Sequence, residues 1–126
     1  MSHDRREILT FAAMGAALST LPASAIAADG APLYGLIGQM VAQPGKRDEL
    51  VGYLREATGA MPGCLSYQVA LDAGNADAIW ITEVWDSRES HQASLQLPAV
   101  RAAIAKARPI IAAMPMHVET VPLMGA

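Results

Sequence analysis

The sequence predicts an α+β fold with the element order β-α-β-β-α-β, the ferredoxin-like sandwich. Two observations lead to this prediction. Stretches in which apolar residues alternate, as in strands, occur on both sides of stretches in which they recur at helical spacing. The chain has 126 residues, which is enough for one domain with a single modest core. We expect this domain to span residues 33–123.

The expected elements follow one another closely. Pro-Gly pairs at 44–45 and 62–63 bound the first helix, and the turn-rich segment 73–77 joins the second and third strands into a hairpin. Pro98 restarts or bends the second helical region. We expect strands over residues 33–41, 64–72, 79–85 and 114–123, and helices over residues 46–61 and 86–107.

The stretch from Ile79 to Ser94 concentrates the candidate chemistry. In a strand, residues alternate between faces, so Glu83 and Trp85 share the face opposite to Trp80. Asp86 is a good helix N-cap, and Glu89 three residues later completes a carboxylate version of the capping box. His91 then falls in the second turn of the helix.

Composition excludes several classes of function. The formal net charge is −3 and basic residues do not cluster, which argues against a nucleic-acid partner. Cys64 is the only cysteine, so an internal disulfide and a cysteine-based zinc cluster are both excluded. The mature domain has only two histidines and no carboxylate–histidine spacing typical of metal ligands. We therefore expect no metal.

Residues 1–27 have the features of a signal peptide of the twin-arginine type. Arg5 and Arg6 precede an apolar run, Leu9–Leu21, which is too short to span a bilayer comfortably. Ala25-Ile26-Ala27 then offers an A-x-A cleavage site. We expect recognition by the twin-arginine export machinery, cleavage, and a periplasmic or secreted protein. The alternatives are an uncleaved membrane anchor and an amphipathic helix that the mature protein keeps.

The first and third predicted strands are apolar on both faces. Ile37 and Val41 alternate with Leu36 and Met40, and the third strand shows the same lack of polar positions. A ferredoxin-like sheet has helices on one face only, so the other face needs a cover. We expect a homodimer in which a second copy covers it. The alternative is a monomer with scattered surface hydrophobic residues.

Several fragments together resemble the antibiotic biosynthesis monooxygenase domain family. The family's pattern is Pro-Gly-Cys before the second strand, Glu-x-Trp at the end of the third, and a His six residues after the Trp. Here these positions are Pro62-Gly63-Cys64, Glu83, Trp85 and His91. The likeness covers roughly residues 33–121. It implies a dimeric α+β barrel, and its characterised members include oxygenases that use neither metal nor flavin.

Cofactor-free oxygenation needs an apolar pocket, a base and donors that stabilise an anion. His91 is the natural base, and Glu83 orients it or takes a proton itself. Trp85 and Tyr67 are expected to wall the substrate ring, and Tyr34 to contact the substrate as well. Each residue also has a structural alternative: His91 as a hydrogen-bonded core residue, Glu83 paired with Arg88, Arg101 or Arg108, and the aromatic residues as core.

The resulting hypothesis is a monooxygenase without cofactors that combines O₂ with a quinol-like or other aromatic small molecule. Haem-cleaving relatives place an axial histidine late in the second helical region. Val100–Ile104 contains none, which counts against haem. The alternative hypothesis is a non-catalytic dimeric module that binds a small hydrophobic ligand.

Overall fold

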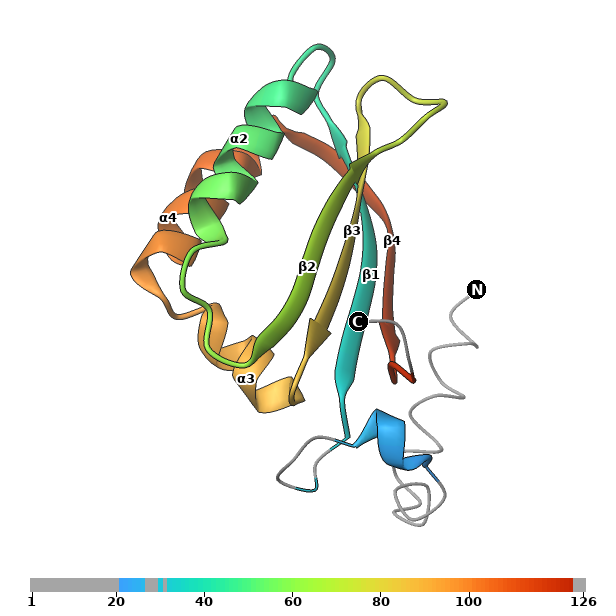
Figure 1. Cartoon of the computed structure of the whole chain (residues 1–126). Helices are drawn as coiled ribbons and strands as arrows, with labels where there is room; N and C mark the ends of the chain where they lie inside the picture. Colours follow the sequence, from blue (N-terminus) through green and yellow to red (C-terminus); the bar gives the residue numbers. More distant parts are fainter. Residues whose placement is uncertain (1–20, 27–29, 31, 124–126) are drawn as a thin grey trace.

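The computed structural model describes residues 21–26, 30 and 32–123, and it confirms the ferredoxin-like α+β fold (Figure 1). The predicted order β-α-β-β-α-β is present, with the second helical region divided in two. The elements are β1 (Tyr34–Ala42), α2 (Arg47–Ala57), β2 (Cys64–Leu71), β3 (Ala78–Trp85), α3 (Arg88–Ser94), α4 (Pro98–Ala107) and β4 (Ile111–Thr120), with 3₁₀ turns at Ala23–Ala25 and Arg108–Ile110.

The four strands form one antiparallel sheet in the order β2-β3-β1-β4. In Figure 1, α2 and α4 lie side by side against one face of this sheet. Leu36 of β1 pairs with Glu83 of β3 on one side and Glu119 of β4 on the other. Directly paired residues project from the same face. These three side chains therefore share one face.

The core lies between the helices and the sheet in two clusters. One surrounds Leu50 of α2 and Ile79 of β3, which are both fully buried. The other surrounds Trp85, with Tyr34 and Leu36 of the neighbouring strand. The predicted faces of β3 are thus correct, because Ile79 and Trp85 are both buried on the helix side. The second cluster lies beside α3, which carries His91.

The first helix and the last strand differ most from their predicted bounds. The first helix ends at Ala57 rather than Met61, because the backbone N–H and side-chain hydroxyl of Thr58 both donate to the carbonyl of Arg55, at 3.3 and 3.0 Å. This capping closes the last turn. The last strand begins at Ile111 rather than Met114, and an irregular register near Met40 accommodates the added residues.

The predicted cap of the second helical region is wrong by one residue. Ser87 is the N-cap of α3, and its hydroxyl accepts a hydrogen bond from the Ser90 backbone N–H at 3.1 Å. Asp86 instead donates its backbone N–H to the carbonyl of Gly63 at 2.9 Å. This bond ties Asp86 to the turn before β2, and the helix begins after Ser87.

Gly63 fixes the position of α3 against the sheet. Its φ angle is +86°, in the left-handed region that favours glycine. A Cβ atom here would lie 2.5 Å from the Ser90 side chain and 2.8 Å from Asp86 Oδ1. The turn and the first residues of α3 therefore approach more closely than any other residue would permit.

Most of the predicted signal peptide lies outside the described residues, including Arg5, Arg6 and Ala27. Within the described part, Ala25 is buried and its carbonyl accepts a 2.7 Å hydrogen bond from the Leu33 backbone N–H. No helix within the described ranges has the length and apolar character needed to span a bilayer.

Candidate active site

A cavity of about 450 Å³ lies between the helices and the sheet. His91, Glu83, Trp85 and Tyr67 all line it, so four of the five predicted site residues come together around one space. Most of the remaining wall is apolar. The aliphatic and thioether side chains in this wall include Met40, Leu54, Met61, Ile81, Leu95, Val100, Ile104, Ile111 and Met114. The cavity has the size and polarity of a site for an aromatic small molecule.

Local structure explains why these side chains converge. Glu83 and Trp85 are two residues apart on β3 and therefore project from the same face toward the helices. The chain then turns at Ser87 into α3, where His91 occupies the second turn. This turn brings His91 back beside the end of the strand that carries Glu83 and Trp85.

His91 is held between two aromatic rings. Its ring centroid lies 5.3 Å from that of Trp85 in an edge-on arrangement, and 5.4 Å from that of Tyr34. Burial lowers the pKa of His91, and this effect outweighs the nearby Glu83 carboxylate, which raises it. His91 is therefore a neutral imidazole near pH 7, which can accept a proton.

Glu83 is hydrogen-bonded to Trp85 rather than to an arginine. The indole N–H of Trp85 donates to Glu83 Oε1 at 2.8 Å. His91 Nε2 is 3.9 Å from the same oxygen, too far for a direct hydrogen bond. The carboxylate thus acts on His91 through its charge, while Trp85 fixes its position.

Tyr34 lies behind His91 and is not among the residues that line the cavity. Its hydroxyl donates to Glu119 Oε2 at 2.7 Å, and Arg88 forms two hydrogen bonds to the Glu119 carboxylate at 2.7 and 2.9 Å. The Arg88 guanidinium also lies 4.9 Å from the centre of the Tyr34 ring. Burial, with the hydrogen bond to Glu119, raises the pKa of Tyr34 to about 12.

The sequence does not predict the Arg88–Glu119 pair. The two residues are 31 positions apart and meet only because β4 returns beside β1. One feature of the sequence could have indicated a role for Glu119. It lies in an alternating strand, on the same side as His117. The pair holds Tyr34 against His91, so it supports the site from the side opposite to the cavity.

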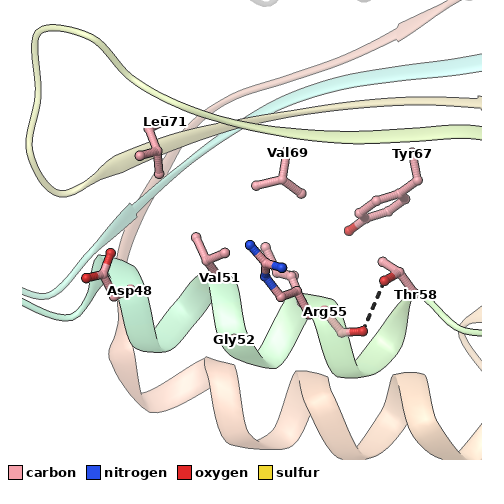
Figure 2. Close-up of a pocket in the computed structure, with 9 residues that line it drawn as sticks. Asp48, Val51, Gly52, Arg55, Thr58, Tyr67, Val69 and Leu71 are labelled. Atoms are coloured by element: carbon pink, nitrogen blue, oxygen red, sulfur yellow. Dashed lines mark hydrogen bonds between the residues drawn. The ribbon is translucent and has the colours of Figure 1, made fainter.

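A second cavity, of about 560 Å³, lies between α2 and the edge strand β2 (Figure 2). Val51 and Val69 face each other across it, and Arg55 and Tyr67 add polar groups. Tyr67 lines this groove as well as the His91 cavity. Burial raises the pKa of the Tyr67 hydroxyl well above its usual value, and the nearby Glu83 carboxylate adds to the effect. Tyr67 therefore stays protonated and can donate a hydrogen bond.

Within residues 21–26, 30 and 32–123, no group of three or more His, Cys, Asp or Glu side chains is placed to hold a metal ion.

Trp80 lies on the sheet face opposite to Trp85, and its indole N–H donates to Asp72 Oδ2 at 2.7 Å. Trp80 therefore anchors the β2–β3 turn and takes no part in the cavity.

Comparisons with known proteins place this geometry in a family. A profile of the antibiotic biosynthesis monooxygenase family matches residues 33–106. A crystal structure from Chloroflexus aurantiacus J-10-fl, provisionally named as such a monooxygenase, is 62% identical. It covers 75% of this chain and 96% of its own, with a TM-score of 0.73.

More distant structures share the fold. A Caulobacter crescentus CB15 protein is 20% identical, with a TM-score of 0.64, and covers 73% of this chain and 91% of its own. A Nitrosomonas europaea protein is 14% identical, with a TM-score of 0.67, and covers 72% of this chain and 90% of its own. Among proteins of curated function, no match was found. The family profile and the Chloroflexus relative show that the chain belongs to the antibiotic biosynthesis monooxygenase family.

Proposed function

We propose that the protein is a cofactor-independent monooxygenase that acts on quinol-like or other aromatic small molecules. The observation that carries this proposal is the neutral imidazole of His91 at the wall of a mostly apolar cavity of about 450 Å³. An aromatic ring fits such a space, and a neutral histidine can take its phenolic proton. Family membership supports the same reaction class.

The reaction begins when His91 accepts a phenolic proton from the bound quinol. The resulting anion is electron-rich enough to reduce O₂ itself. One oxygen atom becomes bonded to a ring carbon, and the other leaves as water after the proton on His91 returns. The quinol supplies all four electrons, so quinol and O₂ give hydroxyquinone and water without another reductant.

The other residues stabilise the charge that develops. The protonated Tyr67 hydroxyl donates to the phenolate or to the peroxide-like oxygen. Trp85, 1% exposed, provides one wall for the ring and fixes Glu83. The Glu83 carboxylate then favours the imidazolium that His91 becomes.

Oxygen uptake with hydroquinones tests this proposal. Wild-type protein should consume O₂, and ¹⁸O₂ should label the hydroxyquinone product, whereas spontaneous oxidation gives unlabelled quinone and peroxide. His91→Ala should lower the rate at least about a hundredfold, the usual contribution of a general base. His117→Ala, which removes an exposed histidine, should leave it unchanged. Equal uptake by wild type and His91→Ala would remove His91 from the mechanism.

The second candidate function is a non-catalytic module that binds a small hydrophobic ligand. Met40, Met61 and Met114 in the cavity wall favour it, because flexible thioether side chains adapt to ligands of different shapes. Anaerobic titration followed by tryptophan fluorescence measures binding alone. Tight binding of an aromatic ligand without labelled product from any quinol would select this alternative.

The proposed assembly is a homodimer, as in a dimeric α+β barrel. The sheet face opposite to the helices carries Ile37 and Val84, which are half-buried, and Val118, which is 37% exposed. Apolar surface of this kind is typical of an interface.

We propose in addition that residues 1–27 direct export by the twin-arginine route to the periplasm or the exterior. Cell fractionation tests the export proposal. It compares the location of the chain that carries Arg5 and Arg6 with that of a chain in which lysines replace both arginines.

A further inference from the structure

The groove between α2 and β2 shares a wall with the His91 cavity. Leu54, Thr58 and Tyr67 line both spaces. Figure 2 shows the Tyr67 hydroxyl pointing from β2 toward α2, near Thr58. No hydrogen bond to a described residue holds that hydroxyl. Packing alone therefore holds Tyr67, which is the partition between the two spaces.

The groove has opposite charges at its two ends. Asp48 lies in the first turn of α2 and Arg55 in the last turn. The two residues are seven positions apart, which corresponds to about 10 Å along the helix axis. In Figure 2, Asp48 and Leu71 lie at one end of the groove, whereas Tyr67 and Thr58 lie toward the Arg55 end. The positive end of the groove therefore adjoins the His91 cavity.

Three cations near the helices pair with carboxylates, whereas Arg55, Arg101 and Arg108 pair with no described carboxylate. Lys46 pairs with Glu49, Arg88 with Glu119, and Lys106 with Glu56. Among Arg55, Arg101 and Arg108, Arg101 lines neither cavity and Arg108 lines the His91 cavity, whereas the Arg55 guanidinium group extends into the groove (Figure 2). A guanidinium group offers paired N–H donors that match the two oxygens of a carboxylate.

We infer that the substrate carries a carboxylate, which Arg55 binds while the aromatic ring occupies the His91 cavity. This inference rests on the proposed function and names Arg55 as a residue that determines specificity. Asp48 repels an acid from the far end of the groove, so the carboxylate lies close to the partition. A short chain between ring and carboxylate is the arrangement that satisfies both His91 and Arg55.

Anaerobic binding tests the inference without turnover. The probes are 2,5-dihydroxyphenyl alkanoic acids with one, three or five methylene groups, together with their methyl esters. Quenching of tryptophan fluorescence reports binding, because Trp85 lines the cavity. For one chain length, wild-type protein should bind the acid about tenfold or more tightly than the ester, as expected for a charge-assisted pair.

Arg55→Gln should abolish this preference by weakening the acid alone and leaving ester affinity unchanged. The matched control Arg101→Gln, which removes an exposed arginine that lines neither cavity, should keep the preference. The inference is overturned if wild type does not prefer the acid at any chain length, including the case in which no probe binds, or if Arg55→Gln retains the preference.

The two proposals can fail separately. An acid preference that depends on Arg55, without labelled product in air, would overturn the monooxygenase proposal and leave the carboxylate site intact. Labelled product from acid and ester at equal rates, with equal affinities, would overturn the carboxylate site and leave the monooxygenase proposal intact.

Discussion

The indole N–H of Trp85 is hydrogen-bonded to Glu83 at 2.8 Å, and this bond fixes the carboxylate that faces His91. Glu83 therefore contributes a negative charge at a set distance, without a hydrogen bond to the imidazole. Two substitutions can separate these contributions. Replacing Glu83 removes the charge that acts on His91, whereas replacing Trp85 removes the hydrogen-bond donor that positions the carboxylate.

Glu83→Gln should lower the pKa of His91 further. The amide oxygen still accepts the hydrogen bond from Trp85, but the charge that favours the imidazolium is gone. NMR titration of the His91 ring measures this shift. A deprotonated base is required, so the acidic limb of any pH–rate profile should move to lower pH. Glu56→Gln, which removes an exposed carboxylate of α2 that pairs with Lys106, is the matched control and should leave the titration unchanged.

Trp85→Phe should raise the pKa of His91 and reduce stability. The ring is 1% exposed, and the substitution leaves a void and a half-buried Glu83 carboxylate without its donor. Unfolding by urea should show a loss of about 2 kcal/mol or more. The freed carboxylate then turns toward His91 and stabilises its charged form. An unchanged His91 titration would show that the Trp85 bond does not restrain Glu83.

Acid should destabilise the protein through His91. Because burial lowers its pKa in the folded state, the unfolded chain, with a pKa of about 6.5, binds the proton more readily. This contribution is fully present above about pH 6.5 and is lost as the pH falls toward the folded value. Urea midpoints from pH 8 to 5 should therefore fall less steeply for His91→Gln than for wild type. His117→Gln should retain the wild-type slope.

Glu119→Gln should lower the pKa of Tyr34 from about 12 toward its usual value. The substitution removes the negative charge that opposes ionisation of the hydroxyl, and it leaves Arg88, whose charge favours the phenolate. Spectrophotometric titration at alkaline pH measures the change. Part of the upward shift should persist because burial is its largest cause. Glu89→Gln, a change in an exposed residue of α3, should have little effect.

Val118→Arg should prevent the proposed dimer from forming. Val118 is 37% exposed and pairs with Ile37 on the sheet face opposite to the helices. An arginine there would place an unpaired charge in an apolar interface, which is strongly unfavourable. Light scattering after size-exclusion chromatography should give the monomer mass. Leu95→Arg, at a similarly exposed position after α3, should keep the wild-type mass.

Periodicity along single segments predicted much of this structure. The alternation in β3 places Glu83 and Trp85 together in any sheet, because neighbouring residues of a strand always face opposite ways. His91 follows from a turn of only two residues into a helix. The fold class was predictable for the same reason, since six short patterns in one order permit few arrangements.

Features that depend on tertiary position were not predictable. The Arg88–Glu119 pair requires the sheet order that brings β4 beside β1, and no local pattern encodes that order. Asp86 was predicted to cap the helix because its side chain is suited to that role. Ser87, the next residue along, caps the helix through its own hydroxyl, while the Asp86 backbone is paired with Gly63. Both residues suit an N-cap, and the local sequence does not decide between them.

The close approach at Gly63 gives a way to observe motion of the site. The bond from the Asp86 N–H to the Gly63 carbonyl connects the base of α3 to the start of β2. The bond lies directly beyond the Cys64–Trp85 pair, so it continues the β2–β3 ladder at the point where the chain enters α3. The hydrogen-exchange rate of this single amide therefore measures how often the end of the β2–β3 ladder opens beside the helix that carries His91.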